Sequence, residues 1–114
     1  MGIQHKWTQS EKVIARRAFD RAYEKECMNI LNKVKEMLSE LKSPKEIWKI
    51  EDYLDEERTK VEGKYDYRYS VLIVLFGRLM KDGLIKESDL QGLEEEKIKR
   101  IKLAVCLSRL FKCS

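Results

Sequence analysis

Carboxylates are the most frequent side chains in this sequence that could take part in chemistry. The 114-residue chain carries 20 Asp and Glu residues, and in the stretch DYLDEER the pair Asp52 and Asp55 lies three residues apart. Paired carboxylates can perform general acid–base catalysis, but on an exposed helix they keep ordinary pKa values. Calcium and magnesium sites need loop geometry that a helix does not provide. We therefore expect a solvated helix face at these two positions.

The other reactive side chains are too few and too scattered to build a catalytic centre. His5 is the single histidine and lies near the N-terminus, so no histidine-based dyad, triad or metal cluster can be built. Cys27, Cys106 and Cys113 form an odd set without metal-site spacing, which favours reduced thiols. The sequence also lacks a glycine-rich phosphate loop. These features predict a binding or regulatory protein that is not an enzyme and has no cofactor or metal.

Charge is abundant but evenly mixed along the chain. Charged residues make up 39% of it, yet the formal net charge is only +4. Such interleaving is typical of solvated helix faces, whereas nucleic-acid binding concentrates positive charge on one face. A rival interpretation is a basic last helix that binds nucleic acid or an anionic surface, although three acidic residues just before it argue against this. Its bases are Lys97, Lys99, Arg100 and Lys102.

No segment has the length and composition of a membrane span or a secretory signal. The longest apolar run covers residues 71–76, and the opening MGIQHKWTQSEK lacks an apolar stretch. We expect a cytoplasmic protein without an integral membrane segment.

Apolar spacing predicts a nearly all-helical chain that begins with one long helix. Thr8 and Glu11 form a capping box at its start, and helical spacing continues to Leu41. A helix of about 30 residues is too long to be covered by the rest of so short a chain, so we expect part of it to contact a second subunit. The alternative is an amphipathic helix folded back on its own domain. Its apolar residues form a heptad seam: Tyr23, Cys27, Ile30, Val34, Met37 and Leu41.

The second helix also has clear start and stop signals. Ser43, Pro44 and Glu46 predict an N-cap, a first-turn proline and a second capping box. Gly63 predicts a left-handed C-terminal cap after about Glu62.

The second helix places a tryptophan away from its apolar face. At about 100° per residue, Trp48 points about 140° from the middle of the apolar stripe, with Asp52 one turn further on. Such a tryptophan is either covered elsewhere in the chain, or a harmless surface residue, or an anchor for a partner. Glu51 and Arg58 lie on the shoulder between the two faces. The stripe itself consists of Ile47, Ile50, Tyr53, Leu54 and Val61.

Two further helices follow the link GKYDYRYS. The stretch VLIVLFGRLM is apolar nearly all round and predicts a core helix that contains Phe76 and ends at Gly83. Ser88 caps a short turn, and EEEKIKRIKLAVCLSRLF forms the last helix. The predicted fold is a single all-α domain over residues 1–114. Within it, residues 8–62 are extended dimerisation helices and residues 63–114 form a compact C-terminal head and tail.

The middle and end of the chain resemble the fluorescence recovery proteins of cyanobacteria. That family shows a Trp, an Asp four residues on and an Arg six further, followed by Gly-Lys-Tyr-Asp-x-Arg-x-Ser-Val. The matching residues are Trp48, Asp52, Arg58 and the segment 63–71. The opening AFDRAYEKE also resembles the first helix of the family, so the likeness covers about residues 7–105.

The resemblance implies an all-helical homodimer without a cofactor, which binds the C-terminal domain of the orange carotenoid protein. Members of the family promote the return of the light-activated red form to the resting orange form. They also help that protein leave the phycobilisome, and so end photoprotective quenching. Such a chain would reach the thylakoid membrane only through its partner.

Two sets of candidate residues follow from the pattern and the resemblance. Arg100 stands where family members carry a lysine, Glu51 where they often carry His, and Val74 where an aromatic is familiar. The last two differences leave open a related helical dimer that acts on a different protein partner. The partner-binding set is Trp48, Glu51, Asp52, Arg58, Phe76 and Arg100. The interface set, for a homodimer or a higher oligomer, is Ile30, Val34, Met37, Leu41, Ile47, Ile50 and Leu54.

Overall fold

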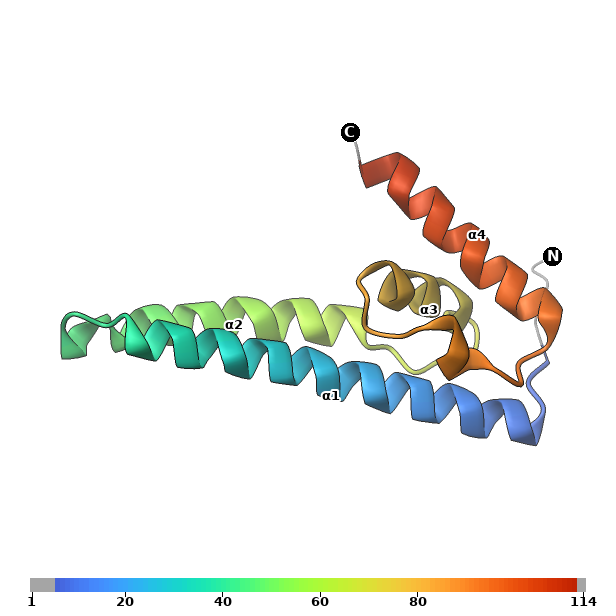
Figure 1. Cartoon of the computed structure of the whole chain (residues 1–114), viewed down its shortest axis with the longest axis horizontal. Helices are drawn as coiled ribbons and strands as arrows, with labels where there is room; N and C mark the ends of the chain where they lie inside the picture. Colours follow the sequence, from blue (N-terminus) through green and yellow to red (C-terminus); the bar gives the residue numbers. More distant parts are fainter. Residues whose placement is uncertain (1–5, 113–114) are drawn as a thin grey trace. The chain divides into compact units, whose positions relative to one another are not determined.

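The computed structural model describes residues 6–112, with side chains as far as residue 107. The described chain consists of α-helices and two short 3-10 helices, without a strand (Figure 1). The all-α class predicted from the sequence is confirmed, while His5 and Cys113 lie outside the described residues. None of the described helices combines the length and apolar character needed to cross a bilayer. The elements are α1 Gln9–Ser39, η1 Pro44–Glu46, α2 Ile47–Lys64, α3 Leu72–Lys81, η2 Glu87–Leu90 and α4 Glu95–Lys112.

The chain divides into two units, and the boundary falls inside α1. The compact unit consists of residues 1–22 and 66–114, and the hairpin unit consists of residues 23–65. The hairpin unit contains the rest of α1 and all of α2, which run side by side (Figure 1). Nothing in the sequence pattern indicated that the first turns of α1 belong with α3 and α4.

The start of α1 is the capping box that the sequence predicts. The Thr8 N–H donates to Glu11 Oε1 at 3.0 Å, and the Glu11 N–H donates to Thr8 Oγ1 at 3.2 Å. These two bonds satisfy N–H groups that have no partner within the helix.

The second predicted capping box is wrong. Ser43 is extended (φ −145°, ψ 142°) and its hydroxyl makes no capping hydrogen bond. The Glu46 N–H donates instead to the Ser43 carbonyl at 3.0 Å, because Pro44 starts a 3-10 turn that closes on itself. As a result, α2 begins only at Ile47.

The predicted stop at Gly63 is also wrong. α2 continues through Gly63 to Lys64, and positive φ angles among the described residues occur only at Gly83 and Gly92. The Tyr65 N–H donates to the Val61 carbonyl at 2.9 Å, and both Lys64 and Tyr65 bind Glu26 of α1. These side-chain contacts hold the last turn helical.

The third helix ends where the sequence predicts. Gly83 has φ 77°, and the Gly83 and Leu84 N–H groups donate to the carbonyls of Met80 and Leu79 at 3.1 and 2.9 Å. The expected cap at Ser88 is wrong, because the N-cap of η2 is Lys86, whose N–H donates to Asp89 Oδ2 at 2.8 Å.

The compact unit has a well-formed hydrophobic core. α3 and α4 approach closely at Gly77, where a methyl group would lie 2.6 Å from Ala104 Cβ, so glycine is required there. The core draws on all of the helices in this unit: Ala15, Ala18, Phe19 and Ala22 from α1, Leu72, Leu75, Phe76 and Leu79 from α3, Leu84, Ile85, Leu90 and Leu93 around η2, and Ile101 and Val105 from α4.

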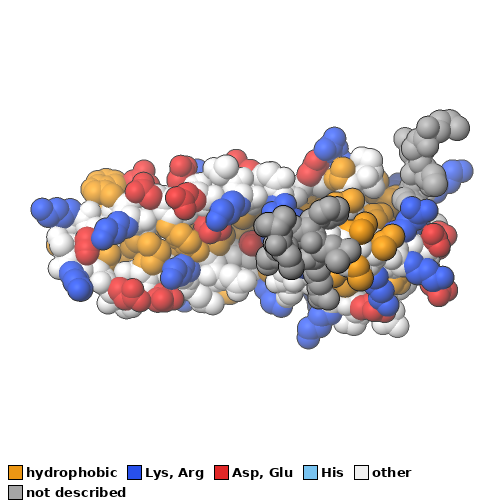
Figure 2. Space-filling view, turned by 90° about the horizontal axis from the view of Figure 1, so that it is seen from above, with side chains coloured by type: hydrophobic (Ala, Val, Ile, Leu, Met, Phe, Trp, Pro, Cys, Tyr) orange, Lys and Arg blue, Asp and Glu red, His pale blue; other side chains and the backbone are white. Residues whose placement is uncertain are grey.

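The hairpin unit has almost no core of its own. Ile50 is the single buried hydrophobic residue among its described side chains. Its exposed large hydrophobics are Tyr23, Met28, Leu31, Leu38, Ile47, Trp48 and Leu54. Figure 2 shows hydrophobic side chains gathered in a band along this unit, between flanks of charged side chains.

Candidate partner-binding site

Trp48 lies in the first turn of α2 with 64% of its surface exposed. Glu51 and Asp52, one turn further along, are also exposed and make no ion pair among the described residues. An indole of this size in water, beside free carboxylates, is a suitable anchor for a partner. The predicted outward position of Trp48 is therefore present in the structure.

Arg58 lies on a different side of α2 from Trp48. At about 100° per residue, Arg58 is about 20° from Ile47 around the helix axis, whereas Trp48 is about 100° away. Arg58 is exposed and makes no ion pair with the described residues. The predicted patch is thus divided between two faces, with Trp48 and Asp52 on one and Arg58 beside the apolar stripe.

Arg58 lines a groove between α1 and α2. The groove has a volume of about 260 Å³, and Tyr23, Cys27 and Ile30 of α1 meet Leu54, Arg58 and Val61 of α2 around it, together with Glu57 and Glu62. Apolar walls with a guanidinium and carboxylates on the rim can receive an apolar side chain of another molecule and an ion pair beside it.

Glu26 closes the hairpin at the end of α2. Its Oε1 accepts hydrogen bonds from Lys64 Nζ at 2.7 Å and from the Tyr65 hydroxyl at 2.9 Å. The Tyr65 ring also packs edge-on against Tyr23, with ring centroids 5.2 Å apart. Lys64 and Tyr65 of the Gly-Lys-Tyr-Asp signature therefore hold the two helices together, a role for which Glu26 gave no sequence signal.

Asp66 and Arg68 of the signature pair with each other in the compact unit, and Tyr67 between them packs against α1. Arg68 Nε donates to both carboxylate oxygens of Asp66 at 2.9 and 2.8 Å, and this bond lowers the pKa of Asp66. The Tyr67 ring packs edge-on against Phe19 at 4.9 Å, with the Arg16 guanidinium 4.6 Å above it. Burial, followed by the hydrogen bond with Tyr69, raises the pKa of Tyr67 to about 12.

The two candidates in the compact unit differ in their accessibility. Phe76 is fully buried in α3, so the expectation that it contacts a partner is corrected: its ring fills the core. Arg100 is half-buried on α4, and its Nε lies 3.4 Å from Glu96 Oε1 without a hydrogen bond to any acceptor.

Leu103 and Leu107 share the exposed side of α4 with Arg100, and Val74 of α3 is 67% exposed. We call Arg100, Leu103 and Leu107 the α4 face.

Among the described side chains of α4, Lys99 is the one base that is exposed and makes no ion pair. Lys97 is buried, while Arg100 and Lys102 are paired with Glu96 and Glu87 at 3.4 and 2.8 Å. The nucleic-acid interpretation loses its main support, because phosphate contacts need free cations on one face.

The predicted dimer residues fall into two groups. Ile47 and Leu54 of α2 are 49% and 41% exposed, whereas Ile50 is buried within its own chain. The other candidates are half-buried: Ile30, Val34 and Met37 of α1, and Leu41, which lies beyond the end of α1 at Ser39, so the helix stops two residues before the predicted position. The seam of α1 is therefore partly covered by the same chain, which was the alternative to a subunit contact.

The chain matches known proteins over most of its length. A family model described as photoprotection regulator fluorescence recovery protein matches residues 7–105. The fluorescence recovery protein of Synechocystis sp. is 35% identical over 96 residues, which cover 84% of this chain and 88% of that protein. The solved structure from Fremyella diplosiphon has a TM-score of 0.80 at 32% identity, and that from Synechocystis sp. has 0.81 at 34%. Both alignments cover 88% of this chain and 98% of the other.

The fold and these matches define a helical protein of a photoprotection-regulator class. The chain belongs to the fluorescence recovery protein family.

Proposed function

We propose that the chain binds the C-terminal domain of the photoactivated orange carotenoid protein and accelerates its return from the red to the orange form. It would thereby end quenching of phycobilisome fluorescence, by binding and without catalysing a reaction. Under the same proposal it works in the cytoplasm and reaches the thylakoid membrane only through its partner. Membership of the family supports this proposal.

The observation that carries the proposal is the exposure of Trp48. A tryptophan with 64% of its surface in water contributes little to the core of its own chain. It stands, with Asp52 and Arg58, at the positions that match the family pattern. Tryptophan and arginine are the residues most often found as binding hot spots. On the compact unit, the α4 face is a second candidate surface for the partner, because it also combines an arginine with exposed apolar side chains.

The mechanism follows from differential affinity. A regulator that binds one conformer of a two-state partner more tightly shifts the population by the ratio of the two affinities. Tighter binding of the red form brings the regulator to the photoactivated conformer but by itself favours that conformer, so the return is faster only if the transition state between the conformers is bound more tightly still. No group of the regulator needs a perturbed pKa for this, since no bond is made or broken.

The working form that we propose is a homodimer held by the hairpin unit. Ile47 and Leu54 are about half exposed on the side of α2 that carries Arg58, next to the groove lined by Tyr23, Cys27 and Ile30. A second copy would cover this apolar side in a symmetric contact. Arg58 would then lie at the edge of the interface, and Trp48 would remain outside it on the other face.

A second candidate is a regulator of the same fold with a different protein partner. Two specific features favour it: Glu51 puts an anion beside Trp48, and Val74, 67% exposed, presents an aliphatic side chain where the family has an aromatic. Both alter the chemistry that a partner would meet.

Comparing the two forms of the carotenoid protein tests the proposed function. Complex formation is measured by size-exclusion chromatography, with the dark-adapted orange form and the illuminated red form at equal concentrations. We expect at least about tenfold tighter binding of the red form, equivalent to about 1.4 kcal/mol. Trp48→Ala should weaken this complex, whereas Lys45→Ala, an exposed change in η1, should not. Equal affinity for both forms would rule the proposal out, and the absence of any complex would favour the second candidate.

A further inference from the structure

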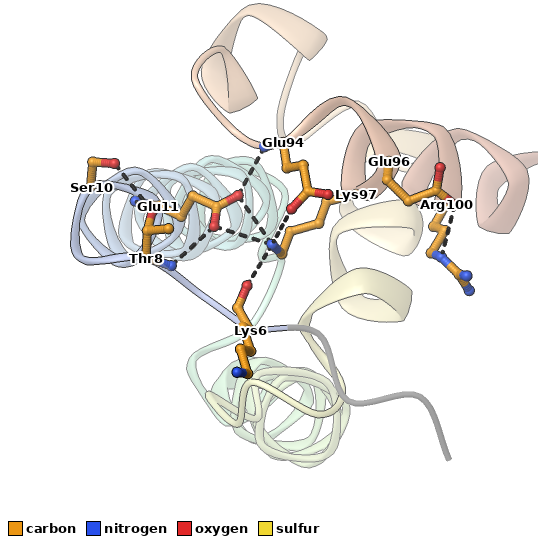
Figure 3. A network of polar contacts seen from close by, with 8 residues as sticks. All are labelled: Lys6, Thr8, Ser10, Glu11, Glu94, Glu96, Lys97 and Arg100. Atoms are coloured by element: carbon orange, nitrogen blue, oxygen red, sulfur yellow. Dashed lines mark hydrogen bonds and ion pairs between the residues drawn. The ribbon is translucent and has the colours of Figure 1, made fainter. Parts of the chain in front are cut away.

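The compact unit contains an ion pair that is almost completely withdrawn from water. Lys97 of α4 is 2% exposed and Glu11 of α1 is 4% exposed. Lys97 Nζ lies 3.1 and 3.2 Å from the two carboxylate oxygens of Glu11 and also 3.4 Å from Glu94 Oε2 (Figure 3). We call Glu11 and Lys97 the latch.

Glu11 binds the starts of two helices at once. Its Oε1 accepts from the Thr8 N–H at 3.0 Å, and its Oε2 accepts from the Glu94 N–H at 2.8 Å, directly before α4 begins at Glu95. One carboxylate therefore satisfies an N–H group at the beginning of α1 and another at the beginning of α4.

Lys97 connects α4 to the segment before α1. Its Nζ donates to the Lys6 carbonyl at 2.7 Å and lies 5.1 Å from the centre of the Trp7 ring. Figure 3 shows Lys97 pointing from α4 toward both Glu11 and the Lys6 carbonyl. The first turn of α4 is thus fixed in direction by hydrogen bonds, which are more specific in geometry than apolar packing.

The α4 face begins one turn beyond the latch. Arg100 follows Lys97 by three residues, and Leu103 and Leu107 follow at helical spacing. Further along, α4 is held by apolar contact, with Ile101 and Val105 buried and Ala104 against Gly77. Apolar packing alone tolerates sliding and rotation more easily than a hydrogen-bonded charge pair does.

We propose that Glu11 and Lys97 are positioning residues that fix the orientation of the α4 face for its protein partner. This inference rests on the proposed function, since it assumes that the α4 face binds the carotenoid protein. A buried ion pair is rarely more stabilising than apolar residues of the same size. The reason for keeping one is the single geometry that it imposes on α4.

The test compares three variants with the parent. Lys97→Met leaves the Glu11 carboxylate buried without its cation, so thermal stability falls. The double variant with Glu11→Gln and Lys97→Met removes both charges and nearly keeps both side-chain lengths, so the cost of an unpaired buried carboxylate disappears. Only part of the thermal stability returns, because one of the Thr8 and Glu94 N–H groups loses its acceptor. Lys102→Met is the matched control, because it removes a lysine from the same helix whose ion pair with Glu87 is exposed.

Two readouts separate positioning from stability. One is the affinity for full-length photoactivated orange carotenoid protein at a temperature where all variants are folded. The other is hydrogen exchange of the backbone amides, compared between residues 95–101 and the hairpin unit. For the double variant we expect at least about a tenfold loss of affinity, the loss of one hot-spot contact, and faster exchange confined to residues 95–101. The control should match the parent in both.

The outcomes are distinct. If the double variant recovers parental affinity together with its thermal stability, the latch is only structural and the inference is overturned. If the parent chain does not bind the carotenoid protein at all, the proposed function fails, and the exchange readout decides the latch alone. In that case faster exchange limited to residues 95–101 supports a positioning role for the latch in α4, and parental or uniformly raised exchange overturns it.

Discussion

The compact unit and the hairpin unit use the same kind of amphipathic helix to different ends. In the compact unit the apolar sides of α1, α3 and α4 are buried against one another, and the core includes Leu72, Phe76 and Ile101. In the hairpin unit only Ile50 is buried among the described hydrophobic side chains, while Ile47 and Leu54 are about half exposed. The compact unit therefore has the core that a single copy needs, whereas the hairpin unit leaves most of its large apolar side chains in water, as the proposed dimer requires.

The largest expected effect is the loss of the dimer on placing a charge in the hairpin surface. Leu54→Arg would bury an unpaired guanidinium in the proposed interface, which costs about 4 kcal/mol or a thousandfold in Kd. In sedimentation velocity, we expect the parent to sediment as a dimer and the variant to sediment as a monomer. Thr59→Arg adds the same charge on the Trp48 side of α2, where it is exposed, and should stay dimeric. A dimeric Leu54→Arg variant would show that the hairpin surface is not the interface.

The next largest effect is on the free energy of unfolding, which should fall much more on truncation of a core residue than on truncation of an exposed one. Phe76→Ala empties a fully buried position and should lower the free energy of unfolding by about 3–5 kcal/mol. Trp48→Ala changes an exposed side chain and should lower it by less than about 0.5 kcal/mol. Urea unfolding followed by circular dichroism measures both. Similar losses for the two variants would contradict the division between core and surface.

Acid should weaken the compact unit through Glu11. Burial alone would raise the pKa of Glu11, but hydrogen bonds from the Thr8 and Glu94 N–H groups and from Lys97 outweigh it and lower the pKa from 4.5 to about 2. Because the folded pKa is the lower one, this stabilisation is complete above about pH 4.5 and is lost as the pH falls toward 2.

Unfolding free energies between pH 5 and 2 measure this contribution. The slope from one such group approaches about 1.4 kcal/mol per pH unit within that window. Glu11→Gln should flatten the slope by that amount, and Glu96→Gln, an exposed change on the same unit, should leave it unchanged. An unaltered slope in Glu11→Gln would show that the latch carboxylate does not titrate as described.

The smallest loss of binding between chains is expected for the two hairpin residues of the proposed binding site. Trp48→Ala and Arg58→Ala should each remove most of the acceleration that the parent chain gives, so that the recovery rate falls by up to about tenfold toward its value without the chain, as expected for a hot-spot contact of about 1.4 kcal/mol. Helical content measured by circular dichroism should stay at the parental level. Parental recovery rates in both variants would place the binding site elsewhere.

Local signals explain how much could be predicted from the sequence. The capping box of Thr8, the end of α3 at Gly83 and the outward position of Trp48 depend on neighbouring residues, and all three are present in the structure. The predicted cap at Ser43 is wrong because a 3-10 turn forms there, and the predicted stop at Gly63 is wrong because contacts with Glu26 keep the last turn of α2 helical.

The remaining features depend on contacts distant in sequence. The sequence presents Lys97 as one of several solvated bases on α4. Lys97 is buried because the fold places it against Glu11, 86 residues away in the chain. The apolar pattern of α3 correctly predicts a core helix that contains Phe76, and only the inclusion of Phe76 in the partner-binding set is wrong. A contact such as that between Glu11 and Lys97 leaves no periodicity in the chain.

The most direct test of the account is the dark recovery of the illuminated orange carotenoid protein, followed by its absorbance change from red to orange. With the parent chain added at an equal molar amount, we expect the first-order rate constant to rise by at least about tenfold, equivalent to about 1.4 kcal/mol of preferential binding to the transition state. A recovery rate that is the same with and without the chain would contradict the proposed function.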